Sequence, residues 1–182
     1  AGCTSTISSV VVSQNTVTPI VSSGVSAVLN CTLSNVNANA TTATSPVSYA
    51  WSGSGITSAS NISTITVNQP GTFNYTVTNT TNGCASTGNV SVTQNTVAPG
   101  VTGSAPTVLT CTTTSGQAIA TTTTTPVTYN WTGPSITGGA TTGTATVNQP
   151  GTYNYTVTST ANGCKTVGSV AVTQNTVAPS GL

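Results

Sequence analysis

The sequence predicts an all-β chain composed of two tandem domains. Apolar residues recur at every second position along many short segments, as expected for half-buried strands, and the strand-favouring residues Thr and Val are abundant. No stretch shows the 3.6-residue period of an amphipathic helix. An internal repeat with an offset of 80 residues divides the chain into equivalent parts.

The repeat is close to identical over its best-matched segment. Residues 68–84 read NQPGTFNYTVTNTTNGC and residues 148–164 read NQPGTYNYTVTSTANGC, so three of 17 positions differ. QNTVAP also occurs twice, at 94–99 and at 174–179. A unit of 80 residues is long enough to form a small autonomous domain and longer than a solenoid repeat.

A partial third copy opens the chain, since residues 2–19 align with residues 83–99 after insertion of one residue. Residues 1–18 are therefore the last strand of a preceding repeat or a donor strand that joins a neighbouring subunit. The N-terminus lacks the basic and apolar regions of a signal peptide, so we expect a mature form or an internal fragment. The predicted domains are 19–98 and 99–178, and residues 179–182 begin a further repeat or form a tail.

Each repeat carries signals for about seven short strands. Alternation places Val25, Ala27, Leu29, Cys31 and Leu33 on one face of a strand. The same pattern covers 47–51 and 73–77, and it recurs at 127–131 and 153–157.

Turn residues punctuate these strands. Pro70-Gly71 and Pro150-Gly151 fit turns with Pro in the second and Gly in the third position. Asn82-Gly83 and Asn162-Gly163 predict hairpins with two-residue loops.

The composition excludes several classes of function. The chain has one basic residue, Lys165, and no Asp, Glu or His. Acid–base catalysis and metal binding draw on the missing side chains, so we expect no enzyme, cofactor or metal site. Nucleic-acid binding needs several Lys or Arg residues and is not expected either. Membrane insertion is not expected because no run of 18 apolar residues exists.

Four of the five cysteines are equally spaced. Cys31 and Cys84 are 53 residues apart, as are Cys111 and Cys164, which predicts one disulfide within each repeat. Such disulfides indicate a location outside the cytosol. Cys3 occupies the position that Cys84 and Cys164 hold in their repeats, so we expect it to be unpaired or intermolecular.

The order Cys31, Trp51, Cys84 resembles that of immunoglobulin-like (Ig-like) sandwiches, although the second cysteine is expected at the start of the last strand, G, instead of within strand F. The combination of Y-x-W, QPGT(F/Y)NYTVT, NGC and TQNTVAP also resembles tandem Ig-like or PKD-like repeats of giant secreted gliding and adhesion proteins of Bacteroidota. The resemblance implies tandem Ig-like β-sandwich domains, one disulfide each, on a bacterial cell surface. The predicted core residues are Trp51, Trp131, Tyr49, Tyr129, Tyr75 and Tyr155.

These features predict a non-enzymatic extracellular structural or adhesive fibre segment, such as an adhesin stalk. The alternative is a filament-forming subunit that polymerises by β-strand addition of its N-terminal strand. Expected partners are neighbouring repeats or identical subunits, and surface glycans are a further candidate. The absence of acids leaves two hypotheses open, namely an uncharged surface suited to assembly, or natural Asp at positions read here as Asn.

Overall fold

The computed structural model describes residues 1–4 and 8–177, which form two compact units. Unit 1 consists of Ala1–Ala27 and Asn35–Thr93. Unit 2 consists of Val28–Ser34 together with the chain from Gln94 onward. The units therefore differ from the sequence repeats, because unit 2 takes a short segment from within the first repeat.

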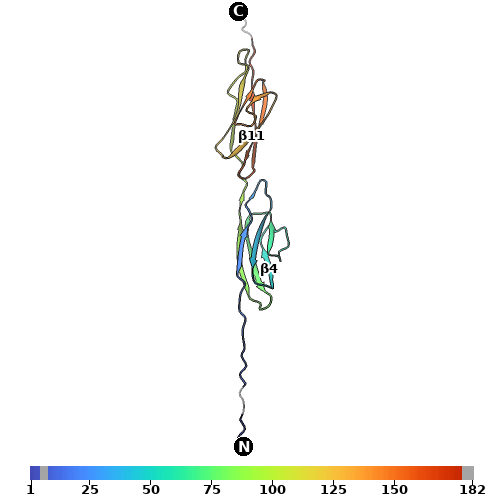
Figure 1. Cartoon of the computed structure of the whole chain (residues 1–182). Coiled ribbons are helices and arrows are strands. Elements are labelled where there is room, and N and C mark those ends of the chain that lie inside the picture. Colours follow the sequence, from blue (N-terminus) through green and yellow to red (C-terminus); the bar gives the residue numbers. More distant parts are fainter. Residues whose placement is uncertain (5–7, 178–182) are drawn as a thin grey trace, which may run out of the picture. The chain divides into compact units, whose positions relative to one another are not determined.

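Unit 1 contains two antiparallel sheets (Figure 1). One sheet has the order β1 (Val21–Val25), β3 (Val36–Thr42), β5 (Thr64–Val67). The other has the order β4 (Val47–Ser52), β6 (Gly71–Asn79), β7 (Ala85–Val92). Pro70 and Gly71 lie where the chain crosses from β5 in the first sheet to β6 in the second.

Unit 2 repeats this arrangement. One sheet has the order β12 (Ile136–Gly138), β13 (Thr144–Val147), β10 (Gly116–Thr122), β9 (Val101–Ser104). The other has the order β11 (Val127–Thr132), β14 (Gly151–Ser159), β15 (Lys165–Val172). The short strands β2 (Leu29–Asn30) and β8 (Gln94–Asn95) pair in parallel. Figure 1 labels β4 and β11, which occupy equivalent places in the two units.

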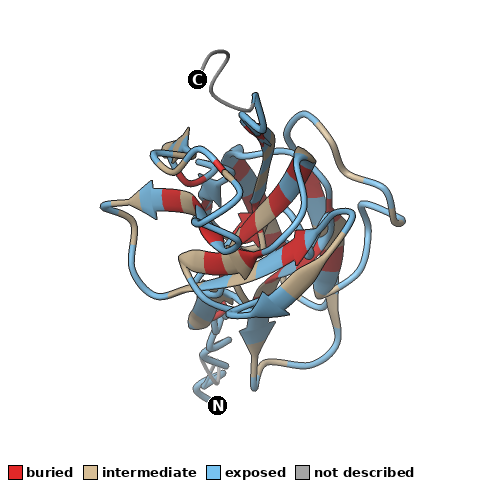
Figure 2. Ribbon diagram, turned by 90° about the horizontal axis from the view of Figure 1, so that it is seen from above, coloured by how far each residue is buried: buried red, intermediate tan, exposed pale blue. Residues whose placement is uncertain are grey.

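Each unit is a β-sandwich with a single core. Buried and exposed residues alternate along most strands, as the colours in Figure 2 show. The core of unit 2 draws its side chains from both sheets, including Ala118 of β10 and Val157 of β14. In unit 2, the order β9-β10-β13-β12 facing β11-β14-β15 matches the A-B-E-D and C-F-G sheets of Ig-like sandwiches. The sheets of unit 1 have the same order without the fourth strand of the first sheet. The prediction of an all-β chain of tandem Ig-like domains is therefore confirmed.

An aromatic pair lies at equivalent positions in each core. The ring centroids of Trp51 and Tyr75 are 5.2 Å apart, and those of Trp131 and Tyr155 are 5.3 Å apart. All four side chains are buried. The ring N–H of Trp131 donates to the Thr142 carbonyl at 2.9 Å, which satisfies the one polar group that the indole buries.

The other two predicted core tyrosines lie less deeply. Tyr49 and Tyr129 are half-buried, and Tyr129 packs against the edge of the unit 2 core.

Two local predictions are wrong. Residues 25–33 do not form one strand, because β1 ends at Val25 and the Asn30 side chain then turns the backbone. The Asn-Gly pairs do lie in hairpins, but the loops are longer than two residues. The N–H of Gly83 donates to the Asn79 carbonyl at 2.8 Å, so that the loop between β6 and β7 spans residues 80–84.

Replacing Gly168 by Ala is expected to destabilise unit 2 by about 1–3 kcal/mol. A Cβ at this position would overlap the phenol oxygen of Tyr155, and the buried pairing with Trp131 keeps that ring from moving aside. Urea unfolding followed by tryptophan fluorescence measures the loss. Gly100→Ala is the matched control, since a Cβ at Gly100 meets nothing within 4 Å. Equal stability of the two variants would contradict the described packing.

Candidate covalent cross-link site

The loop Val28–Ser34 in unit 2 owes its shape to one asparagine. Asn30 Oδ1 accepts hydrogen bonds from the N–H groups of Thr32 at 3.0 Å and Leu33 at 2.8 Å. The Asn30 N–H donates in turn to the Leu33 carbonyl at 3.0 Å. An asparagine that bonds the backbone two and three residues ahead makes a tight turn instead of a strand. Leu29, only 1% exposed, anchors the loop, and the turn places Cys31 at its tip.

The second half of the site is the turn between β14 and β15, which is organised by Asn162. Its Oδ1 accepts from the Cys164 N–H at 3.1 Å. Its Nδ2 donates to Asn95 Oδ1 and to the Val97 carbonyl, both at 2.9 Å. Asn162 is 6% exposed, so this amide links the turn to the segment after β7 from a buried position.

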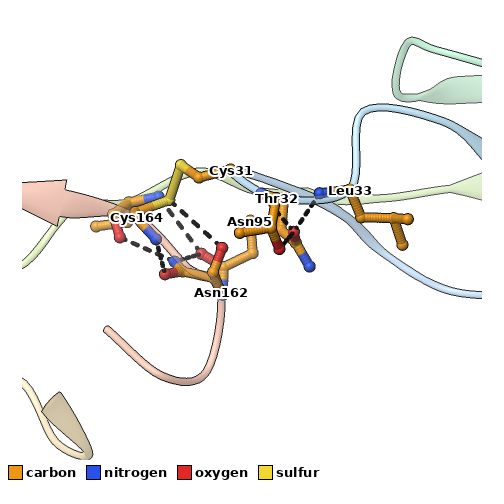
Figure 3. Close-up of a disulfide and its surroundings, with 8 residues drawn as sticks. Cys31, Thr32, Leu33, Asn95, Asn162 and Cys164 are labelled. Atoms are coloured by element: carbon orange, nitrogen blue, oxygen red, sulfur yellow. Dashed lines mark hydrogen bonds between the residues drawn. A yellow bond between two sulfur atoms is a disulfide. The ribbon is translucent and has the colours of Figure 1, made fainter. Parts of the chain in front are cut away.

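A disulfide joins the two halves (Figure 3). Cys31 and Cys164 are bonded, with their Cα atoms 5.0 Å apart. The Cys31 N–H also donates to the Asn162 carbonyl at 3.1 Å. A Cβ on Gly163 would overlap the methyl group of Thr32, so the loop sits directly against the turn. The site therefore combines a covalent bond with close backbone contact.

This connection corrects the predicted disulfides. Cys31 pairs with Cys164 and not with Cys84, and Cys111 does not pair with Cys164. The bonded cysteines are 133 residues apart, which is the 53-residue spacing plus one repeat of 80. The equal 53-residue spacing is compatible with pairing within one repeat and with pairing between successive repeats. Which of the two occurs depends on where the loop Val28–Ser34 packs. Since that loop belongs to unit 2, Cys31 meets Cys164 of the same unit.

The other three cysteines carry free thiols. Cys3 and Cys111 are exposed, and Cys84 is half-buried. Lys165, the one basic side chain, is exposed at the start of β15.

Two other kinds of site are absent from the described residues. Within residues 1–4 and 8–177, no cluster of three potential metal ligands occurs. Over the same residues, no helix is long and apolar enough to cross a membrane.

The asparagines of this site were missed as functional residues by the sequence analysis. A signal for Asn95 and Asn162 was nevertheless present, because both repeats contain Asn-Gly-Cys at the turn and Gln-Asn-Thr-Val in the following segment. By contrast, Asn30 corresponds to Thr110 and has no such signal. The sequence alone does not reveal that these two motifs meet, because the Asn162 amide bonds Asn95 across 67 residues of sequence.

Comparison with known proteins adds similarities of fold. No family model and no curated protein matches the sequence. Extracellular domains 3–5 of Drosophila OTK align with 12% identity over 86% of this chain and 62% of that chain, with a TM-score of 0.42. The I-band fragment I67–I69 of titin aligns with 13% identity over 78% and 59%, with a TM-score of 0.39.

Sidekick-1 immunoglobulin domains 1–5 align with 11% identity over 86% of this chain and 39% of that chain, with a TM-score of 0.38. The chain thus spans less than two thirds of the length of each of these three structures. At these identities and scores, the fold assignment rests on the strand order and core described above, and the functions of those proteins are not transferred.

Removing the disulfide with Cys31→Ser and Cys164→Ser is expected to lower the unfolding free energy of unit 2 by about 4–5 kcal/mol, because the bond closes a very long loop. Urea unfolding in a Trp51→Phe background reports on unit 2 through Trp131. The control pair Cys84→Ser and Cys111→Ser removes free thiols and is expected to shift the transition by at most about 0.5 kcal/mol. Peptide mapping without reductant should recover a Cys31–Cys164 peptide, and a Cys31–Cys84 peptide would contradict the structure.

Proposed function

We propose that this chain is a load-bearing segment of an extracellular structural fibre, of the kind found in cell-surface adhesin stalks. The observation that carries the proposal is the Cys31–Cys164 disulfide, which bridges 133 residues of the chain. The composition supports a role without catalysis, since the chain has no carboxylate or imidazole side chain.

The disulfide changes how the chain would carry force. When the two ends are pulled, tension passes from Cys31 to Cys164 through the S–S bond, and the residues between them are bypassed. That bypassed stretch includes every strand from β3 to β14. Unfolding of these strands then adds no length between the ends, and only the residues outside 31–164 can extend the oxidised chain under load.

The chemistry of the disulfide supports an extracellular location, because disulfides persist in oxidising compartments. The source that the sequence motifs suggest is a bacterial cell surface. Surface glycans are weaker candidates for partners, since a sugar-binding platform needs an exposed aromatic face and both Trp51 and Trp131 are buried.

A second candidate is a filament subunit that adds its N-terminal strand to a neighbour. It is favoured by Val10, Val11 and Val12, which are 84%, 87% and 89% exposed and lie outside the strands. An exposed segment rich in β-branched residues is suited to pairing with a sheet edge of another chain. In the chain itself, β14 is already paired along its length by β15, so such a strand would have to pair elsewhere or displace β15.

Force spectroscopy on single chains tests the load-bearing role. Pulled from its ends, the reduced chain should extend further than the oxidised chain by roughly 450 Å, because each released residue adds about 3.3–3.6 Å. The Cys31→Ser variant should show the long extension without reductant, and Cys84→Ser should keep the short one. Equal extension with and without reductant would refute the proposal.

Immunogold electron microscopy of intact cells of the source organism tests location and form together. Antibody raised against the chain is expected to label thin beaded threads outside unpermeabilised cells. Helically ordered polymers would favour the filament subunit instead. Labelling that appears only after permeabilisation would contradict both candidates.

A further inference from the structure

The free Cys111 lies at the tip of a loop that is already shaped like the one bearing Cys31. Thr110 Oγ1 accepts from the N–H groups of Thr112 at 3.3 Å and Thr113 at 2.9 Å, as Asn30 Oδ1 does in the first loop. The Thr110 N–H donates to the Thr113 carbonyl at 2.9 Å. The loop Val108–Thr114 is thus preformed, with Cys111 exposed.

This second loop is also anchored in the same way. Leu109 is 2% exposed and forms a parallel bridge with Gln174. Leu29 is 1% exposed and pairs in parallel with Gln94. A residue offset of 80 therefore relates the two loops in sequence, conformation and anchoring.

The free Cys84 lies in a turn that matches the one bearing Cys164. Asn82 Oδ1 accepts from the Cys84 N–H at 3.0 Å. Asn82 Nδ2 donates to Asn15 Oδ1 at 3.1 Å and to the Val17 carbonyl at 3.0 Å. These three bonds reproduce those of Asn162 in unit 2. Unit 1 therefore carries the same receiving surface for a cysteine loop.

The two turns differ in their accessibility. Asn162 and Cys164, which meet the loop Val28–Ser34, are 6% and 1% exposed. Asn82 and Cys84 are half-buried, and a Cβ built on Gly83 would meet nothing within 4 Å. The turn of unit 1 thus has the hydrogen-bonding pattern of the occupied site together with the open surface that a loop would cover.

We propose that Cys111 of one copy of this chain forms a disulfide with Cys84 of a second copy, with the loop Val108–Thr114 seated on the turn Asn82–Cys84. Each copy presents the loop on unit 2 and the turn on unit 1, so the contact is head-to-tail and continues from copy to copy. The inference rests on the proposed structural function and adds its partner. It is tested separately, since the force measurement needs one chain and this contact needs two.

When the first copy binds, Asn82 of the second copy can exchange its present partners for identical residues of the first. Gln14-Asn15-Thr16-Val17, which Asn82 holds within its own chain, is identical to Gln174-Asn175-Thr176-Val177 beside the Cys111 loop. The segment 174–177 of the first copy can therefore replace the segment 14–17 of the second on Asn82. The net charge of +1 imposes little electrostatic repulsion between copies.

The bond forms by thiol–disulfide exchange with a small disulfide such as oxidised glutathione. The Cys111 thiolate attacks one glutathione sulfur and expels the other as a thiolate, leaving a mixed disulfide. The Cys84 thiolate then attacks the Cys111 sulfur and expels the second glutathione. The two cysteines are oxidised, oxidised glutathione is reduced to two thiols, and the two cysteine protons end on those thiols.

Mixing two full-length variants in a glutathione redox buffer tests the pairing. Both carry Cys3→Ser, one also carries Cys84→Ser, and the other also carries Cys111→Ser. The mixture should give a Cys84–Cys111 heterodimer at least tenfold more abundant than the homodimers of either variant alone. Cys3→Ser alone should form a ladder of disulfide-linked oligomers. Homodimers as abundant as the heterodimer, or no cross-linked product, would overturn the proposal.

Single asparagine changes test the seating of the loop. In the variant that supplies Cys84, Asn82→Ala should slow heterodimer formation about tenfold, whereas Asn15→Ala should speed it by releasing the competing segment. In the variant that supplies Cys111, Asn175→Ala should slow it. Urea unfolding of each variant verifies that unit 1 and unit 2 remain folded. Equal rates for all folded variants would refute the proposed seating.

Discussion

The burial of alternating side chains between two facing sheets is the interaction on which the rest of the structure depends. Val, Ala, one Trp–Tyr pair and one further aromatic ring, Phe73 in unit 1 and Tyr153 in unit 2, fill most of each core. Close packing makes small changes costly in such a core, as the position of Gly168 against Tyr155 illustrates. The sandwiches in turn hold the turns Asn82–Cys84 and Asn162–Cys164 in one fixed shape.

Asparagine amides link distant segments of this chain, a role that ion pairs fill in more highly charged proteins. With one basic residue and no acids, the side chains of this chain cannot form ion pairs with one another. Asn30 shapes a loop, and Asn82 and Asn162 each bind their own turn and a distant segment. An amide both donates and accepts, so one side chain can organise two pieces of backbone at once. Hydrogen bonds between neutral groups are also less sensitive to salt than surface ion pairs.

The low charge and the free cysteines both bear on contact between copies of the chain. A surface near neutrality offers little resistance to contact between copies. The exposed thiol of Cys111 and the half-buried thiol of Cys84 lie in the same local structures as a pair that is bonded in unit 2. Under the proposals above, the same disulfide contact would serve within one chain and between two copies, and a fibre would lengthen without any new type of contact.

The sequence by itself determined the all-β class and the equivalence of the two repeats, because strand alternation and near-identical segments are local and readable. It also indicated Trp51 and Trp131 as core positions. It could not determine the partner of Cys31, since a pairing that recurs every 80 residues looks the same within one repeat or across two. Only the tertiary structure decided this, because the Asn30 turn ends the strand and the loop Val28–Ser34 packs in unit 2, where Cys164 is within bonding distance.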